Sequence, residues 1–281
     1  MKKFIAAFDG LNFCESTMSY SIYLAQHCGA KLVGVFLEDF SRRSYGTVEI
    51  AHYAGEDLDR HIKELDEKDD QIRRKHIRQF QEACKTAGIQ HAIHRDRNVA
   101  MQELLHESIY ADLLIISPSE TLTRYQEPTP SRFVRELLND VQCPVVLVPA
   151  TYHPVNKIIL LYDGEPSSVH AVRTFSYLFE NMKDLDIEVL TIKEKEDSVL
   201  LPDGRLIKEF IQQHYPSAEA VVLKGDPEEE IALYLQREKR KPIVVCGSYQ
   251  RSKFSRLFKP SMADYLLRHA TVPLFVAHNK S

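Results

Sequence analysis

The chain has 281 residues, of which 44% are hydrophobic and 27% are charged, and its formal net charge is −4 at pH 7. This composition is typical of a globular protein with a substantial core and argues against disorder. The net negative charge argues against a general nucleic-acid binder, and no apolar run is long enough to span a bilayer.

The first half of the chain alternates predicted strands and helices. "FIAAF" (4–8) is a continuous apolar run, as expected for a strand covered on both faces, and a helix follows with Met18, Ile22 and Ala25 on one stripe. Strand "KLVGVFL" (31–37) comes next, and then a long charged helix within Glu56–Ala87. The half is completed by strand "HAIHR" (91–95), helix Val99–Tyr110, strand "LLIIS" (113–117), helix Ser131–Asn139 and strand "VVLVP" (145–149).

The second half of the chain repeats the first. "FIAAFDG" (4–10) recurs as "IILLYDG" (158–164), the segment 112–138 recurs as 242–267, and "VQCPVVLVPA" (141–150) recurs as "ATVPLFVAH" (270–278). Matched blocks in the same order predict a tandem duplication. We therefore expect two domains, at residues 1–150 and 156–281, joined where a proline ends the preceding strand.

Each half has five predicted strands with intervening helices. This pattern predicts an α/β fold of two tandem five-stranded parallel sheets, doubly wound and Rossmann-like. The apolar strands 145–149 and 273–277 each need a cover, so we expect the two halves to pack on each other through them. An insertion near residues 40–70 has almost no counterpart in the second half. Its charges predict a solvated face, and a surface that docks a partner is the alternative.

The chain has five cysteines and no Cys-x-x-Cys pair: Cys14, Cys28, Cys84, Cys143 and Cys246. Their odd number and their spacing predict reduced thiols in a cytoplasmic protein. Cys246 lies in an apolar run and is expected to act as a small buried hydrophobic residue. His91 and His94 would face opposite sides of a strand and make a poor metal pair. No Ser/His/Asp or Cys/His set converges on one rim, so we predict no catalytic residue, no metal site and no enzyme.

Taken together, these features resemble a tandem universal stress protein. The resemblance rests on two copies of strand-Asp-Gly, the "VVCGS" strand and turn, a Ser-led helix and the "VPLFVA" strand, and it covers essentially the whole chain. It implies a five-stranded parallel sheet that commonly dimerises through its last strand. One branch of the family binds ATP through Gly-x-x-Gly, nine residues, then Gly-Ser or Gly-Thr. The other branch lacks this pattern and does not bind ATP detectably.

The resemblance implies that Asp9 and Asp163 approach an adenine, whereas their ordinary role is that of turn and cap residues. The glycine pattern itself is broken in both halves. Its positions in the second half hold Gly247, Gln250, Pro260 and Ser261. Its positions in the first half hold Ser117, Glu120, Pro130 and Ser131. Proline has no N–H to donate, and Glu120 would place a carboxylate beside the phosphates, so we expect the first-half residues to be inactive.

The second-half loop is basic, because it also carries Arg251, Lys253, Arg256 and Lys259. Such side chains hold phosphate in place of backbone amides, and the other interpretation is a solvated basic loop followed by a helix that Ser261 caps. We predict a universal stress protein-like regulatory or interaction protein of the stress response, with no cofactor. The alternative is a protein that binds ATP or AMP in the second domain only, with slow hydrolysis. Expected partners are a second copy of the chain or an unidentified protein, without nucleic acid or membrane.

Overall fold

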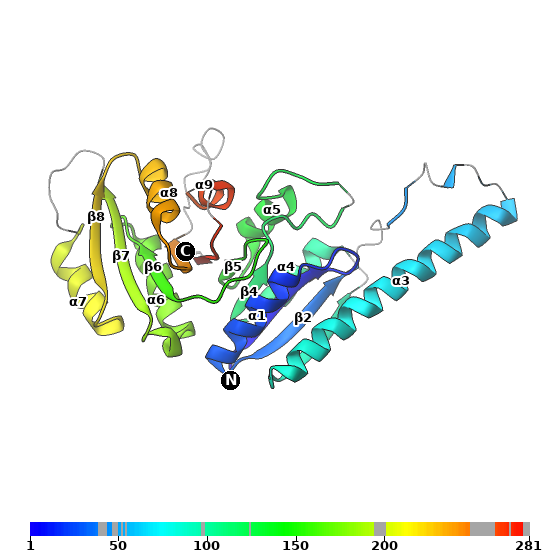
Figure 1. Ribbon diagram of the computed structural model, residues 1–281, viewed down its shortest axis with the longest axis horizontal. Coiled ribbons are helices and arrows are strands. Elements are labelled where there is room, and N and C mark those ends of the chain that lie inside the picture. The colour runs from blue at the N-terminus through cyan, green and yellow to red at the C-terminus, as the bar shows by residue number, and fades with distance from the viewer. Residues whose placement is uncertain are drawn as a thin grey trace.

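The computed structural model describes residues 1–38, 44–46, 50–51, 53, 55–96, 99–123, 125–193, 201–247, 262–269 and 271–277. Its strands form a single sheet in the order β3-β2-β1-β4-β5-β10-β9-β6-β7-β8 (Figure 1). Every strand pair except one is parallel. The predicted α/β fold with a mostly parallel sheet is therefore confirmed.

The first half has the predicted elements, with small shifts at their ends. They are β1 (Lys3–Asp9), α1 (Glu15–Cys28), β2 (Lys31–Leu37), α3 (Gly55–Thr86), β3 (His91–Asp96), α4 (Ala100–Ile109), β4 (Leu113–Ile116), α5 (Arg132–Asp140) and β5 (Val145–Leu147).

The second half repeats this order with a shorter second crossover. Its elements are β6 (Lys157–Leu161), α6 (Pro166–Leu178), the 3-10 helix η1 (Glu180–Met182), β7 (Asp186–Lys193), α7 (Gly204–His214), β8 (Glu219–Lys224), α8 (Pro227–Arg237), β9 (Pro242–Gly247), α9 (Met262–His269) and β10 (Leu274–Ala277).

The two halves join where β5 pairs with β10 in an antiparallel register. Val146 lies opposite Phe275, and Leu147 lies opposite Leu274. The expected contact between the halves through these apolar strands is present. The pairing also joins the two expected five-stranded sheets into one continuous sheet of ten strands. Neither β5 nor β10 is then left as an exposed edge strand, because each pairs with the other.

Helices cover both faces of the sheet, and each face has a core cluster that spans both halves. Phe4, Ala6 and Phe8 point to the face covered by α1, α3, α6 and α7, whereas Ile5 and Ala7 point to the face covered by α4, α5, α8 and α9. Aromatic rings link the halves on the first face. The Phe4 and Phe179 ring centroids lie 6.2 Å apart.

Helix α1 confirms the predicted stripe at Ala25, but it buries Tyr20 and Leu24 more deeply than Met18 and Ile22. Tyr20, Leu24 and Ala25 are fully buried, whereas Met18 and Ile22 are only partly buried. The difference arises because the segment that links the halves packs on this helix. The Tyr20 and Tyr152 rings are 4.8 Å apart, and the Tyr23 hydroxyl donates to the Val155 carbonyl at 2.8 Å.

Helix α3 is the largest departure from the repeat, with 32 residues against 11 in its counterpart α7. Its C-terminal part packs on the sheet through Phe80, whose ring lies 5.5 Å from that of Phe8. Gly34 of β2 makes room for this ring, because a Cβ at that position would lie 2.9 Å from it. The N-terminal part of α3 extends well beyond the sheet (Figure 1).

All five cysteines are free, and Cys246 is 3% exposed, as predicted for a small buried hydrophobe. Within the described residues, no helix combines the length and the hydropathy that crossing a membrane requires.

Phe275 of β10 provides a test of the junction between the halves. It is fully buried, and its ring centroid lies 5.1 Å from that of Phe175. We expect Phe275→Ala to lower the free energy of unfolding by about 3–5 kcal/mol, because it removes a large core side chain and leaves a cavity. Urea denaturation measures this, with Leu206→Ala as the control, since Leu206 is 61% exposed. Equal effects of the two substitutions would contradict the burial of Phe275.

Candidate functional site

Two places on the sheet correspond to the ligand-binding crevice of doubly wound folds. The strand order reverses between β1 and β4 in the first half and between β6 and β9 in the second. Ligands of such folds bind beyond the carboxyl ends of the strands at this reversal. The residues that reach these places are Asp9 and Ser117 in the first half and Asp163 and Gly247 in the second, as predicted from the sequence.

In the first half, Glu120 occupies this place and lies against Asp9. Glu120 is 6% exposed and Asp9 is 1% exposed. Burial raises the pKa of Glu120 to about 7, and the negative charge of Asp9 adds to the rise. The Leu122 amide donates to the Glu120 carboxylate at 3.3 Å. A phosphate here would meet two buried acidic side chains, which is unfavourable for an anion.

The loop that follows Glu120 closes the first-half crevice. Leu122 is 7% exposed, belongs to the core and has a φ of +53°. Ser131 ties the loop to α5: its hydroxyl donates to the Glu120 carbonyl and accepts from the Val134 amide at 3.1 Å. Ser131 is therefore the N-cap of α5, and Pro130 beside it is also buried. The side chains of Glu120, Leu122 and Ser131 are therefore all buried at the place where a nucleotide would bind in this half.

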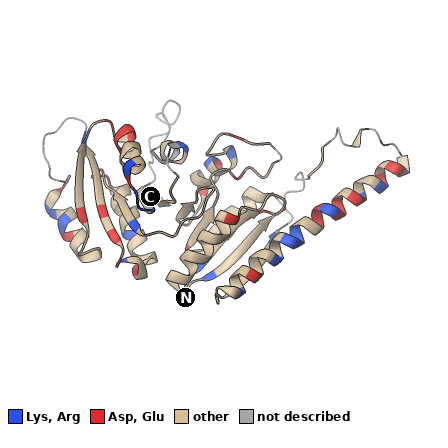
Figure 2. Ribbon diagram, viewed as in Figure 1, with Lys and Arg blue, Asp and Glu red and all other residues tan. Residues whose placement is uncertain are grey.

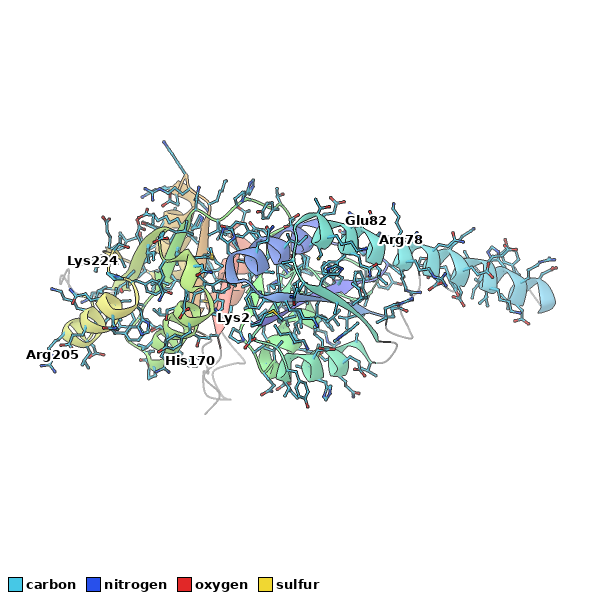
Figure 3. The ribbon with its side chains drawn as sticks, turned by 90° about the horizontal axis from the view of Figure 1, so that it is seen from below. Lys2, Arg78, Glu82, His170, Arg205 and Lys224 are labelled. Carbon is cyan, nitrogen blue, oxygen red and sulfur yellow. The ribbon has the colours of Figure 1, made fainter. Side chains whose placement is uncertain are left out.

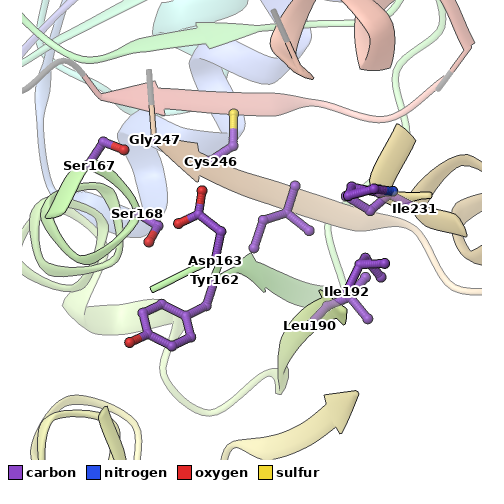
Figure 4. Close-up of a pocket in the computed structure, with 11 residues that line it drawn as sticks. Tyr162, Asp163, Ser167, Ser168, Leu190, Ile192, Ile231, Cys246 and Gly247 are labelled. Atoms are coloured by element: carbon purple, nitrogen blue, oxygen red, sulfur yellow. The ribbon is translucent and has the colours of Figure 1, made fainter. Parts of the chain in front are cut away.

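The second half has a cavity of about 90 Å³ at the equivalent place (Figure 4). Its walls are mostly apolar, and its polar groups come from the turn after β6 and from the start of α6. In Figure 4 the Asp163 carboxylate lies between Ser168 and Cys246. The remaining walls include Leu190, Ile192 and Ile231. The two halves therefore differ at their candidate sites, because the second has a cavity where the first has the buried Glu120.

Gly247 lines this cavity and has a structural role of its own. A Cβ at position 247 would lie 2.5–2.8 Å from backbone atoms of Ser167 and Ser168. Glycine is needed here so that the end of β9 can approach the first turn of α6. Ser117 carries a Cβ at the matching place, so the first half lacks this close approach.

Asp9 and Asp163 form the same turn in the two halves. Asp9 Oδ1 accepts from the Leu11 amide at 2.8 Å, and Asp163 Oδ1 accepts from the Glu165 amide at 2.9 Å. This is the local turn role that Asp ordinarily has after a strand. Their surroundings differ, because Asp9 is buried beside Glu120 whereas Asp163 is exposed at the mouth of the cavity.

The remaining residues predicted for the second-half site lie outside the described residues. They are Gln250, Arg251, Lys253, Arg256, Lys259, Pro260 and Ser261. Helix α9 begins at Met262, directly after Ser261. Among the residues that the structure describes, no three His, Cys, Asp or Glu side chains form a group that could hold a metal ion.

The sequence prediction missed an ion pair that occurs in both halves at the opposite end of the strands. Lys3 at the start of β1 binds Glu107 at 3.2 Å, and Lys157 at the start of β6 binds Glu188 at 2.6 Å and also Glu238. Lys157 is 3% exposed, so these carboxylates stabilise a buried charge. A signal was available, because each copy of the strand-Asp-Gly block is preceded by lysine.

Replacing the buried acid with an amide should make the stability of the first half less dependent on pH. The unfolded chain releases the Glu120 proton near the ordinary pKa of 4.5, whereas the folded chain holds it to about 7, so the wild type loses stability as the pH rises through this window. The stability of Glu120→Gln relative to the wild type should rise by up to about 3 kcal/mol between pH 5 and pH 8.

Urea denaturation at the two pH values measures this difference, with Glu209→Gln as the control because Glu209 is exposed on α7. If the difference in unfolding free energy between Glu120→Gln and the wild type is the same at pH 5 and pH 8, the pKa of Glu120 is not raised by burial.

Comparison with known proteins agrees with this architecture. A sequence model of the universal stress protein family matches residues 154–278. No curated protein sequence matches the chain. The structure is similar to that of a universal stress protein from Archaeoglobus fulgidus, with a TM-score of 0.68 and 15% identity, over 99% of this chain and 98% of the other.

It is also similar to a putative universal stress protein from Pseudomonas aeruginosa, with a TM-score of 0.59 and 13% identity, over 99% of this chain and 93% of the other. At these identities the two structures establish the fold, and the sequence match establishes the family of the matched residues. The chain therefore carries a universal stress protein domain at residues 154–278, within an α/β fold that it shares along nearly its whole length with universal stress proteins.

Proposed function

We propose that this protein is a regulatory or interaction protein of the stress response that acts without ATP chemistry. It consists of two universal-stress-type domains, at residues 1–150 and 156–281, with an insertion near residues 40–70 in the first. It acts in the cytoplasm by binding a protein partner, and it is not an enzyme.

The observation that carries this proposal is the position of Glu120. It lies beside Asp9 at the place where a nucleotide would have to bind, and both side chains are almost fully buried. For a nucleotide to bind here, the loop that Ser131 holds would have to leave the core, and Leu122 would lose its contacts with the core. The first domain therefore serves as a packing and recognition unit.

A second candidate function is the binding of ATP or AMP in the second domain only, with slow hydrolysis at most. The cavity between Asp163 and Gly247 supports it, because its polar groups lie at the N-terminus of α6, where backbone amides favour an anion. The close approach of Gly247 to Ser167 counts against it, since this contact explains the glycine without a ligand.

Calorimetric titration of the full-length protein with ATP and with AMP separates the two functions. We expect no saturable heat at nucleotide concentrations up to about 1 mM, which corresponds to a binding free energy weaker than about −4 kcal/mol. Asp9→Asn and Asp163→Asn are a matched pair of variants, because an amide oxygen preserves the turn that each aspartate makes.

Saturable binding that Asp163→Asn weakens and Asp9→Asn preserves would favour the second candidate. Binding that only Asp9→Asn weakens would contradict the claim that Glu120 closes the first-half site.

A further inference from the structure

Helix α3 presents a stripe of exposed polar residues along most of its length. The stripe occupies positions 57, 60, 64, 67, 71, 75, 78, 82 and 85, at spacings of three or four residues, which keep side chains on one face of a helix. All nine positions are exposed. In order, they read Asp, Arg, Glu, Glu, Gln, Lys, Arg, Glu and Lys.

This stripe lies on the side of α3 that is turned away from the rest of the protein. The sheet contacts the opposite side through the buried Phe80 and Cys84. That opposite side also holds residues 44–45, since the Ser44 amide donates to Asp69 at 3.0 Å and the Tyr45 hydroxyl donates to Asp66 at 2.6 Å. Figure 3 shows Arg78 and Glu82 on the outer side of the helix. A second helix could therefore approach the stripe without meeting the part of the protein that the structure describes.

The charges of the stripe are complementary to themselves when the order is reversed. Consider a second copy of α3 that lies antiparallel to the first, with a two-fold axis at Gln71. Each residue before position 71 in one copy then faces the residue equally far after position 71 in the other copy. The pairs that result are Asp57 with Lys85, Arg60 with Glu82, Glu64 with Arg78, and Glu67 with Lys75. Every pair joins opposite charges, and Gln71 faces Gln71. The two-fold axis repeats each pair, so the complementarity runs along the whole stripe.

We propose that α3 is a dimerisation element that pairs antiparallel with α3 of a second copy of this chain, through the stripe centred on Gln71. This surface lies far from β5, whose edge is already covered by β10 within the same chain. The proposal explains why α3 is the only described helix that extends well beyond the sheet, because one such helix for each chain is sufficient for a two-fold pair (Figure 2).

Each ion pair between the two helices should contribute little by itself, and dimerisation should be sensitive to salt. Exposed ion pairs contribute little one by one, and Arg60 already binds Asp57 within its own helix at 2.5 Å. A network of opposite charges along two helices adds up at low ionic strength and is screened as the Debye length shortens from about 10 Å at 0.1 M salt to about 3 Å at 1 M. Dimerisation should therefore be strongest in dilute buffer.

Charge-swapped variants of the full-length protein test the pairing by sedimentation velocity. Glu64→Lys with Glu67→Lys makes the four inner positions of the stripe positive, and Lys75→Glu with Arg78→Glu makes them negative. Each variant alone should be monomeric at concentrations where the wild type dimerises, because like charges then face each other. An equimolar mixture should form a heterodimer at least about tenfold tighter than either variant with itself, because every inner pair is opposite again.

The control is Asp140→Lys with Glu209→Lys, which changes the net charge on α5 and α7 by the same amount as Glu64→Lys with Glu67→Lys changes it on α3, and should leave the dimer unchanged. Circular dichroism establishes that each variant is folded, and dissociation of the wild-type dimer at about 1 M salt gives an independent measure that needs no variant. A wild type that is monomeric in dilute buffer, a charge-swapped variant that still dimerises alone, or a mixture that stays monomeric would each overturn the proposal.

Discussion

The antiparallel pairing of β5 with β10 determines the architecture of the whole molecule. These two strands are short and almost wholly apolar, so neither could remain at an open sheet edge without cost. Their pairing joins two five-stranded halves into one sheet and lets the core on each face continue from one half into the other. It also reverses the strand direction between the halves. The two candidate crevices therefore open at opposite ends of the sheet and cannot combine into one site.

Two halves with the same topology have diverged at the place where the fold could bind a ligand. In the first, the buried pair of Asp9 and Glu120 makes the place unfavourable for an anion. In the second, Asp163 stays exposed beside a small cavity, while Gly247 is needed for the packing of β9 on α6. The aspartate that the two halves share makes the same local turn in each, which explains its presence without a ligand.

Much of the fold followed from the sequence because its determinants are local or repeated. Apolar runs predicted the strands, the repeated sequence blocks predicted the order of elements in the second half, and the serine after Pro130 predicted the start of α5. The acidic character of the first-half site was also predictable from Glu120 alone. These features depend on residue type and spacing, which the sequence displays directly.

The features that could not be predicted depend on contacts between distant segments. The buried stripe of α1 is set by the linker residues Tyr152 and Val155, and the binding of Lys157 by Glu188 and Glu238 joins segments from three parts of the second half. The positive φ of Leu122 is fixed by its burial in the core, since leucine has no local preference for it. No local pattern of three or four residues contains this information.

Hydrogen–deuterium exchange across the junction tests the central claim most directly. If β5 and β10 form the middle of one sheet, the amides of residues 145–147 and 274–276 that bond across the pair should exchange about as slowly as those of the interior strands β1 and β6. Exchange of both segments as fast as that of the edge strands β3 and β8 would show that the halves are separate sheets, and would contradict the account.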